Sequence, residues 1–117
     1  MRRERRLFLA AGLVALAAGA GALAQSGPRV IKVVARRFVF TPNRIELRKD
    51  EPVVFELTTE DVFMGFNVPD FSVRSDIVPG RTQRLSLTPD KSGTFTFLCD
   101  VFCGEGHESM NGTLVVT

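Results

Sequence analysis

Hydrophobic and polar residues alternate in short segments along most of the chain after its N-terminal region. In VVFELT, residues 53–58, the apolar side chains of Val53, Phe55 and Leu57 fall on one face of an extended strand. In TFTFLC, residues 94–99, the same period of two places Phe and Cys on one face and Thr and Leu on the other. Alternation of this kind predicts strands that bury a single face.

Proline, glycine and aspartate separate these segments in the turns TPN, KDEP, VPG and TPDKSG. Turns at such short intervals are typical of a β-sandwich, and no amphipathic helix of useful length is expected. We therefore predict an all-β, Greek-key β-sandwich that forms one domain over residues 25–117. Its strands are predicted at residues 30–35, 37–40, 44–48, 53–58, 62–68, 81–87, 94–99 and 112–117.

Residues 1–24 have the pattern of an export signal, with a basic start, an uncharged run from Leu7 to Ala24, and a small-x-small cleavage site at its end. Cleavage at that site leaves Gln25 as the mature N-terminus. The sequence RRLFL near the start also resembles the twin-arginine export motif, and an uncleaved membrane anchor is a further alternative. The protein is therefore expected in the periplasm or another extracytoplasmic compartment, and at a membrane only if this segment is retained.

The charge balance argues against nucleic acid binding. The 117-residue chain has 15 basic and 13 acidic residues, and removal of residues 1–24 takes away four arginines and one glutamate, which leaves 11 and 12. A nucleic acid-binding domain is expected to carry a basic surface, which the mature part lacks. Its aromatic residues are unusual, because the whole chain has ten Phe and neither Trp nor Tyr. We interpret most of these Phe as core residues.

All of the cysteine and histidine lies in one short segment, CDVFCGEGHESM, where the spacing is Cys99-x3-Cys103-x3-His107-x2-Met110. Two thiols, an imidazole and a thioether form a soft donor set, which favours copper, whereas zinc sites rarely use methionine. The structural alternative is a Cys99–Cys103 disulfide, which export permits but which leaves the positions of His107 and Met110 unexplained. The acidic residues of the segment, Asp100, Glu105 and Glu108, are interpreted as solvated charges.

Several segments resemble the CuA domain of cytochrome c oxidase subunit II, a cupredoxin that holds two coppers bridged by two cysteine thiolates. They are RFVFTPNRIEL, DEPVVFELTTEDV, GFNVPDF, SGTFTFLC and CGEGH. The resemblance implies a cupredoxin-like fold in which Cys99 and Cys103 bridge the metals. It also implies that His107 and the main-chain carbonyl of Val101 bind one copper and that Met110 binds the other.

One position departs from the family pattern. The family supplies a second histidine from the strand that corresponds to DVFMGFNVP, and this chain has Met64 there. Met64 is either a copper ligand or a core residue, because methionine also fills gaps in cores. A thioether in place of imidazole favours Cu(I), so the resemblance leaves two kinds of copper site open, a dinuclear CuA-like site and a mononuclear one.

Three functions follow from this site, and the first is preferred. The protein is expected to transfer single electrons with a redox partner such as a cytochrome or an oxidase. The alternative is a Cu(I) chaperone or storage protein that delivers copper to another protein, and a third is a mononuclear centre that binds a small ligand such as nitric oxide. No enzymatic activity is expected, because the metal occupies the only histidine and no base remains to activate a nucleophile.

Overall fold

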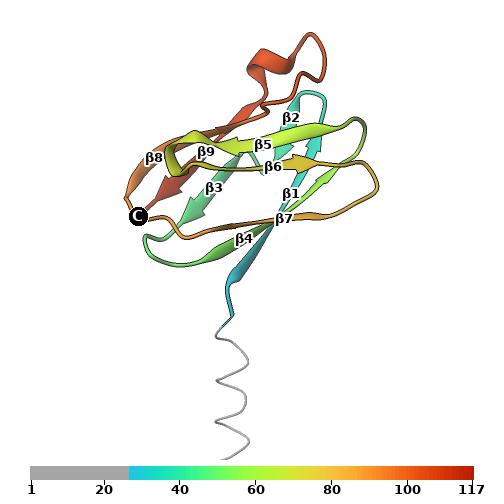
Figure 1. Ribbon diagram of the computed structural model, residues 1–117. Helices are drawn as coiled ribbons and strands as arrows, with labels where there is room; N and C mark the ends of the chain where they lie inside the picture. Colours follow the sequence, from blue (N-terminus) through green and yellow to red (C-terminus); the bar gives the residue numbers. More distant parts are fainter. Residues whose placement is uncertain (1–26) are drawn as a thin grey trace, which may run out of the picture.

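The computed structural model describes residues 27–117, which form a β-sandwich of two sheets (Figure 1). The predictions for residues 1–24, a signal peptide or an anchor, lie outside the described residues. Within residues 27–117, no helix is long and apolar enough to cross a membrane. The predicted all-β fold class is confirmed, since the described elements are nine strands and two short 3-10 helices.

The two sheets have the strand orders β2-β1-β4-β7 and β3-β9-β8-β5-β6. β1 pairs with β4 and β3 pairs with β9 in parallel, whereas the other pairs are antiparallel. The elements, in chain order, are β1 Arg29–Arg36, β2 Val39–Thr41, β3 Arg44–Leu47, β4 Val53–Thr59, β5 Met64–Val68, η1 Pro69–Phe71, β6 Val73–Ile77, β7 Gln83–Leu87, β8 Gly93–Leu98, η2 His107–Ser109 and β9 Asn111–Val116.

The core between the sheets is built around four phenylalanines that are almost completely buried, Phe40, Phe55, Phe66 and Phe97. The ring of Phe66 lies 5.7 Å from that of Phe40, 5.3 Å from that of Phe55 and 5.1 Å from that of Phe97, measured between centroids. These are the spacings at which aromatic pairs attract one another beyond their burial. The predicted alternation in β4 is confirmed, because Val53, Phe55 and Leu57 are buried.

The structure contains one strand that the sequence pattern did not predict. β6 has the sequence VRSDI and pairs with β5 from Met64↔Ile77 to Val68↔Val73, at the edge of its sheet. Only its two end residues are apolar, so hydrophobic alternation gives no signal there. The strand predicted at 37–40 is displaced, because Arg37 and Phe38 form the turn that joins β1 to β2.

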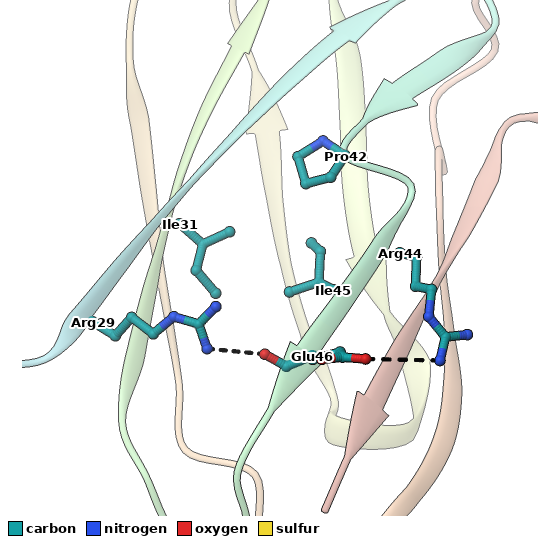
Figure 2. Close-up of a pocket in the computed structure, with 6 residues that line it drawn as sticks. All are labelled: Arg29, Ile31, Pro42, Arg44, Ile45 and Glu46. Carbon is teal, nitrogen blue, oxygen red and sulfur yellow. Dashed lines mark hydrogen bonds and ion pairs between the residues drawn. The ribbon is translucent and has the colours of Figure 1, made fainter.

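A groove opens between β1 and β3, where the edges of the two sheets face each other (Figure 2). Arg29 spans it by donating a hydrogen bond of 2.9 Å from Nη1 to the carbonyl oxygen of Glu46, whose carboxylate lies 3.9 Å from Arg44. Ile31, Ile45 and Pro42 line the rest of the groove. Arg29 begins β1, and at about 3.3 Å per residue the strand extends roughly 20 Å from there to the β1–β2 turn.

Candidate metal centre

The segment that joins β8 to β9, residues 99–110, protrudes from one end of the sandwich (Figure 1). The amide of Cys99 donates to the carbonyl of Met110 at 3.1 Å, which extends the β8–β9 ladder by one pair beyond Leu98↔Asn111. The two ends of the segment are thus fixed by paired strands that lie inside a five-stranded sheet. Both terminal residues, Cys99 and Met110, belong to the predicted donor set.

The last part of the segment turns back through η2. The amide of His107 donates to the carbonyl of Gly104 at 3.1 Å, and the amide of Met110 donates to the carbonyl of His107 at 3.1 Å. Ser109 adds a hydrogen bond of 3.0 Å from its hydroxyl to the carbonyl of Gly106. This single helical turn carries the imidazole of His107 back over the two cysteines.

The structure brings four of the predicted donors together around Cys103. The Cys103 Sγ lies 4.0 Å from Cys99 Sγ, 3.7 Å from His107 Nδ1 and 3.9 Å from Met110 Sδ. The carbonyl oxygen of Val101 is 3.1 Å from Cys99 Sγ. The donor atoms of Cys99, Cys103 and His107 all lie within 4.8 Å of one another.

These distances fit a metal bound by thiolates. Thiolate–metal bonds of about 2.3 Å at tetrahedral angles place two sulfur atoms roughly 3.8 Å apart, and the two cysteine sulfurs are 4.0 Å apart. Cys99, Cys103 and Met110 are buried at 2%, 6% and 1% exposure, which excludes water from the donors. Two thiols, one imidazole and one thioether are the ligand types that copper prefers.

Both cysteines are free thiols in the structure. Burial, followed by the neighbouring Cys99, raises the pKa of Cys103 to about 11. The Cys103 thiol therefore keeps its proton at neutral pH in the metal-free protein, and a bound metal has to displace that proton. The affinity for metal is expected to rise with pH for this reason.

Met64 is placed at the first position of β5 and is fully buried. It belongs to the hydrophobic core and takes no part in the sulfur contacts that join Cys99, Cys103, His107 and Met110. Its burial suits a core residue, and its role as a copper ligand stays a prediction.

Phe38 supports the metal loop from the β1–β2 turn. Gly104 and Gly106 face its ring, and a Cβ added to Gly104 would lie 3.0 Å from the ring, while one added to Gly106 would overlap it. Gly104 also has a φ of 138°, which side chains other than glycine rarely adopt. Of the two phenylalanines that sequence analysis noted in this region, Phe40 is a core residue and Phe38 is a loop contact.

Asp100 is not the solvated charge that the sequence suggested. Arg74 in β6 donates to its carboxylate from Nε at 2.6 Å and from Nη2 at 3.0 Å, and Asp76 receives a third bond of 2.9 Å. Arg74 holds the pKa of Asp100 below its usual range. Gly65 lies beneath this pair, since a Cβ there would overlap the Asp100 carboxylate. The first residue after Cys99 is thereby attached to the sheet edge.

Sequence analysis missed three residues that shape the site: Arg37, Arg74 and Phe102. Arg37 and Arg74 reach the loop from positions 66 and 26 residues away in sequence, so short-range spacing gives no sign of them. Phe102 stands at the loop tip with 76% of its surface exposed, and its ring centroid is 5.7 Å from that of His107. An exposed phenylalanine between two cysteines is a signal that the sequence did contain.

A hollow of about 350 Å³ opens beside the donors, on the side of β8 and β9. Cys99, His107 and Met110 line its inner part, and Glu108 and Asn111 are among its other lining residues. The donor cluster is therefore reachable from the surface at one side, although most of its atoms are buried.

The two-sheet fold and the soft donor cluster define a cupredoxin with a thiolate metal loop. The chain belongs to the cupredoxin-like domain family, whose family model matches residues 7–116. It is 34% identical over 99 residues to cytochrome c oxidase subunit 2 of Thermus thermophilus, a match that covers 83% of this chain and 73% of that relative. In a second form of that protein from the same species, a match of the same length and identity covers 59% of the relative.

Solved structures show the same fold. The periplasmic domain of subunit II of cytochrome oxidase from Bradyrhizobium japonicum has a TM-score of 0.71 at 21% identity, over 76% of this chain and 83% of that one. A copper binding protein solved in its apo form by NMR has a TM-score of 0.65 at 25% identity, over 80% of this chain and 91% of that one. The predicted resemblance to the CuA domain of subunit II is confirmed.

Proposed function

We propose that this protein is an exported, copper-binding cupredoxin that transfers single electrons through a CuA-like thiolate site. The observation that carries the proposal is the clustering of two thiols, an imidazole and a thioether around Cys103, within 4.0 Å of its sulfur. Bound copper would supply the one-electron couple. Cys99, Cys103, His107 and Met110 would hold it, with the carbonyl of Val101 as a weak ligand and Met64 as a further candidate.

The protein frame suits electron transfer because it limits movement of the donors. Both ends of the loop are fixed by the Cys99–Met110 backbone bond, and its middle is pinned by contacts from the β1–β2 turn. A centre whose donors stay in place between oxidation states loses little energy to rearrangement. Burial of both cysteines keeps water away from the thiolates.

The partner in this proposal is a redox protein outside the cytoplasm, such as a cytochrome or an oxidase. The relatives named as cytochrome c oxidase subunit 2 support that assignment. The exposed ring of Phe102, which lies beside His107, gives a partner an apolar surface close to a donor side chain.

Copper delivery is a second candidate function, supported by the hollow beside Cys99, His107 and Met110. An opening of about 350 Å³ at the donors would let a partner's ligand reach copper, which is then cargo rather than a resident cofactor. The thioether-rich donor set also favours Cu(I). Similarity to a copper binding protein solved in its apo form is consistent with this role.

Retention of copper through redox cycles separates the two functions. Full-length protein is loaded with copper, cycled between dithionite and ferricyanide, and then dialysed against a Cu(I) chelator of intermediate affinity. Electron transfer predicts unchanged copper content and a reversible absorbance change in every cycle. Copper delivery predicts loss of copper in the reduced form within the first cycles, and that loss would contradict the preferred function.

A further inference from the structure

Two consecutive residues of the β1–β2 turn hold the metal loop. The side chain of Arg37 donates a hydrogen bond of 3.1 Å from Nε to the main-chain carbonyl of Cys103. The ring of Phe38, next in sequence, packs against Gly104 and Gly106. The turn therefore contacts the loop at the central cysteine and at both glycines that follow it.

Arg37 is itself fixed from the opposite side. Its backbone amide donates to Oδ2 of Asp61 at 3.0 Å, and Oδ1 of Asp61 accepts a bond of 2.6 Å from the amide of Val62. The Asp61 carboxylate thus bonds the backbone of Arg37 and leaves Nε for the Cys103 carbonyl. This chain of contacts links the β4–β5 connection, the β1–β2 turn and the metal loop.

The charge of Arg37 is placed differently from that of Arg74, the other arginine bonded to the loop. Arg74 donates to two carboxylates, Asp76 and Asp100, which offset its charge. Arg37 donates to a neutral carbonyl that belongs to a cysteine. A guanidinium stays protonated at every accessible pH, so a lasting positive charge lies beside the thiol pair.

We propose that Arg37 is a positioning residue of the metal centre, which fixes Cys103 through its carbonyl and raises the reduction potential through its charge. This inference rests on the proposed copper function. Reduction adds an electron to a centre that already carries two thiolates, and a nearby cation stabilises the more negative state. Arg37 keeps part of its surface in water, so screening limits the effect.

Three variants of the full-length, copper-loaded protein test the charge, with the midpoint potential measured by voltammetry. Arg37→Gln removes the charge and should lower the reduction equilibrium about threefold to tenfold, on the order of 30 to 60 mV at 59 mV per tenfold. Arg37→Lys keeps the charge and should retain most of the potential. Arg36→Gln removes an equal charge one residue earlier on the exposed face of β1 and should shift the equilibrium less than twofold.

Amide hydrogen exchange in the metal-free protein tests the positioning role separately. The amides of His107 and Met110 are bonded within the loop, so their exchange rates report how well the loop is held. Arg37→Gln and Arg37→Lys both lose the Nε bond and should exchange these amides about threefold to tenfold faster, because one hydrogen bond to the loop is lost. Arg36→Gln should exchange them at the wild-type rate.

The outcomes distinguish this inference from the proposed function. Equal potential shifts in Arg37→Gln and Arg36→Gln, or wild-type amide exchange in Arg37→Gln, would overturn the role of Arg37. Wild-type protein that binds copper without a reversible couple would contradict electron transfer instead. In that case the exchange rates of the metal-free variants still decide whether Arg37 holds the loop.

Discussion

Arg74 binds both carboxylate oxygens of Asp100, with Nε 2.6 Å from Oδ2 and Nη2 3.0 Å from Oδ1. The pair joins the edge strand β6 to the residue that follows Cys99, so it attaches the first part of the metal loop to the sheet. The Asp100 side chain is 18% exposed and that of Arg74 is 45% exposed. The paired geometry is stronger than a single contact, although solvent screens part of it.

We predict that Asp100→Asn lowers the free energy of unfolding of the metal-free protein by about 1 kcal/mol at pH 7. Arg74 lowers the pKa of Asp100 in the folded state below 3.8. The carboxylate therefore contributes stability above that pH and loses it as the pH falls through the lower, folded-state pKa. Urea unfolding at a series of pH values should show the difference between wild type and variant shrinking in acid.

A second ion pair provides the control for this prediction. Glu56 and Arg84 make one contact of 3.2 Å on the outer face of the first sheet, and Arg84 is 69% exposed. Glu56→Gln should cost less than Asp100→Asn. A difference between wild type and Asp100→Asn that stays constant from neutral to acid pH would contradict the assignment.

Gly106→Ala is predicted to destabilise the protein by about 1 to 3 kcal/mol through overpacking. Gly106 has a φ of −91°, which alanine adopts freely, so the effect isolates the overlap between the new Cβ and the Phe38 ring. Thermal unfolding should show partial recovery in the double variant Phe38→Leu/Gly106→Ala, because the smaller side chain makes room. Gly27→Ala, where a Cβ meets nothing within 4 Å, should leave stability nearly unchanged.

Alkylation of the metal-free protein by iodoacetamide is predicted to be slow at Cys103 below pH 9. Burial and Cys99 raise the pKa of this thiol from 9.0 to about 11, and only the thiolate reacts. At pH 8 the rate should be about a hundredfold below that of a thiol with the ordinary pKa, and it should rise about tenfold per pH unit.

The stabilisation that comes from the protonated Cys103 thiol is retained below pH 9.0 and lost as the pH rises toward 11. Removal of a neighbouring cause provides the control: Cys99→Ala should accelerate alkylation of Cys103, because Cys99 is the second contribution to the raised pKa. A Cys103 reaction rate that levels off by pH 9 would show that the thiol is not perturbed.

Met64→His is predicted to rebuild the second histidine ligand of the family, provided that Met64 faces the metal. Met64 is fully buried, so an imidazole there costs about 1 to 3 kcal/mol in the metal-free protein. Copper should therefore raise the thermal midpoint more in Met64→His than in wild type, and the loaded variant should become purple. Met64→Leu keeps the volume and removes the thioether, so it is the matched control. Equal copper-induced stabilisation in both variants would place Met64 in the core alone.

Sequence patterns predicted the strands that bury a regular apolar face, and β4 is an example because its alternation of Val53, Phe55 and Leu57 is unbroken. β6 escaped prediction because its inner residues, Arg74, Ser75 and Asp76, are polar, and its pairing with β5 is what makes it a strand. The hydrophobic pattern records burial, and an exposed edge strand has little of it.

The donor cluster was predictable for a related reason: Cys99, Cys103, His107 and Met110 lie within twelve consecutive residues, so their spacing alone indicates a shared loop. The residues that hold the loop are different. Arg37 and Arg74 act through long side chains from segments far away in sequence, and only the assembled sheets bring them to Cys103 and Asp100.

Electron paramagnetic resonance of the full-length, copper-loaded protein tests the central claim most directly. The account predicts a Cu(II) signal in the oxidised protein, with hyperfine splitting narrowed by delocalisation onto the thiolates, that disappears on reduction and returns on reoxidation. Splitting shared by two equivalent coppers would identify a dinuclear centre, and splitting from one copper would identify a mononuclear centre. A spectrum that stays silent while copper remains bound would contradict electron transfer and would favour delivery of Cu(I).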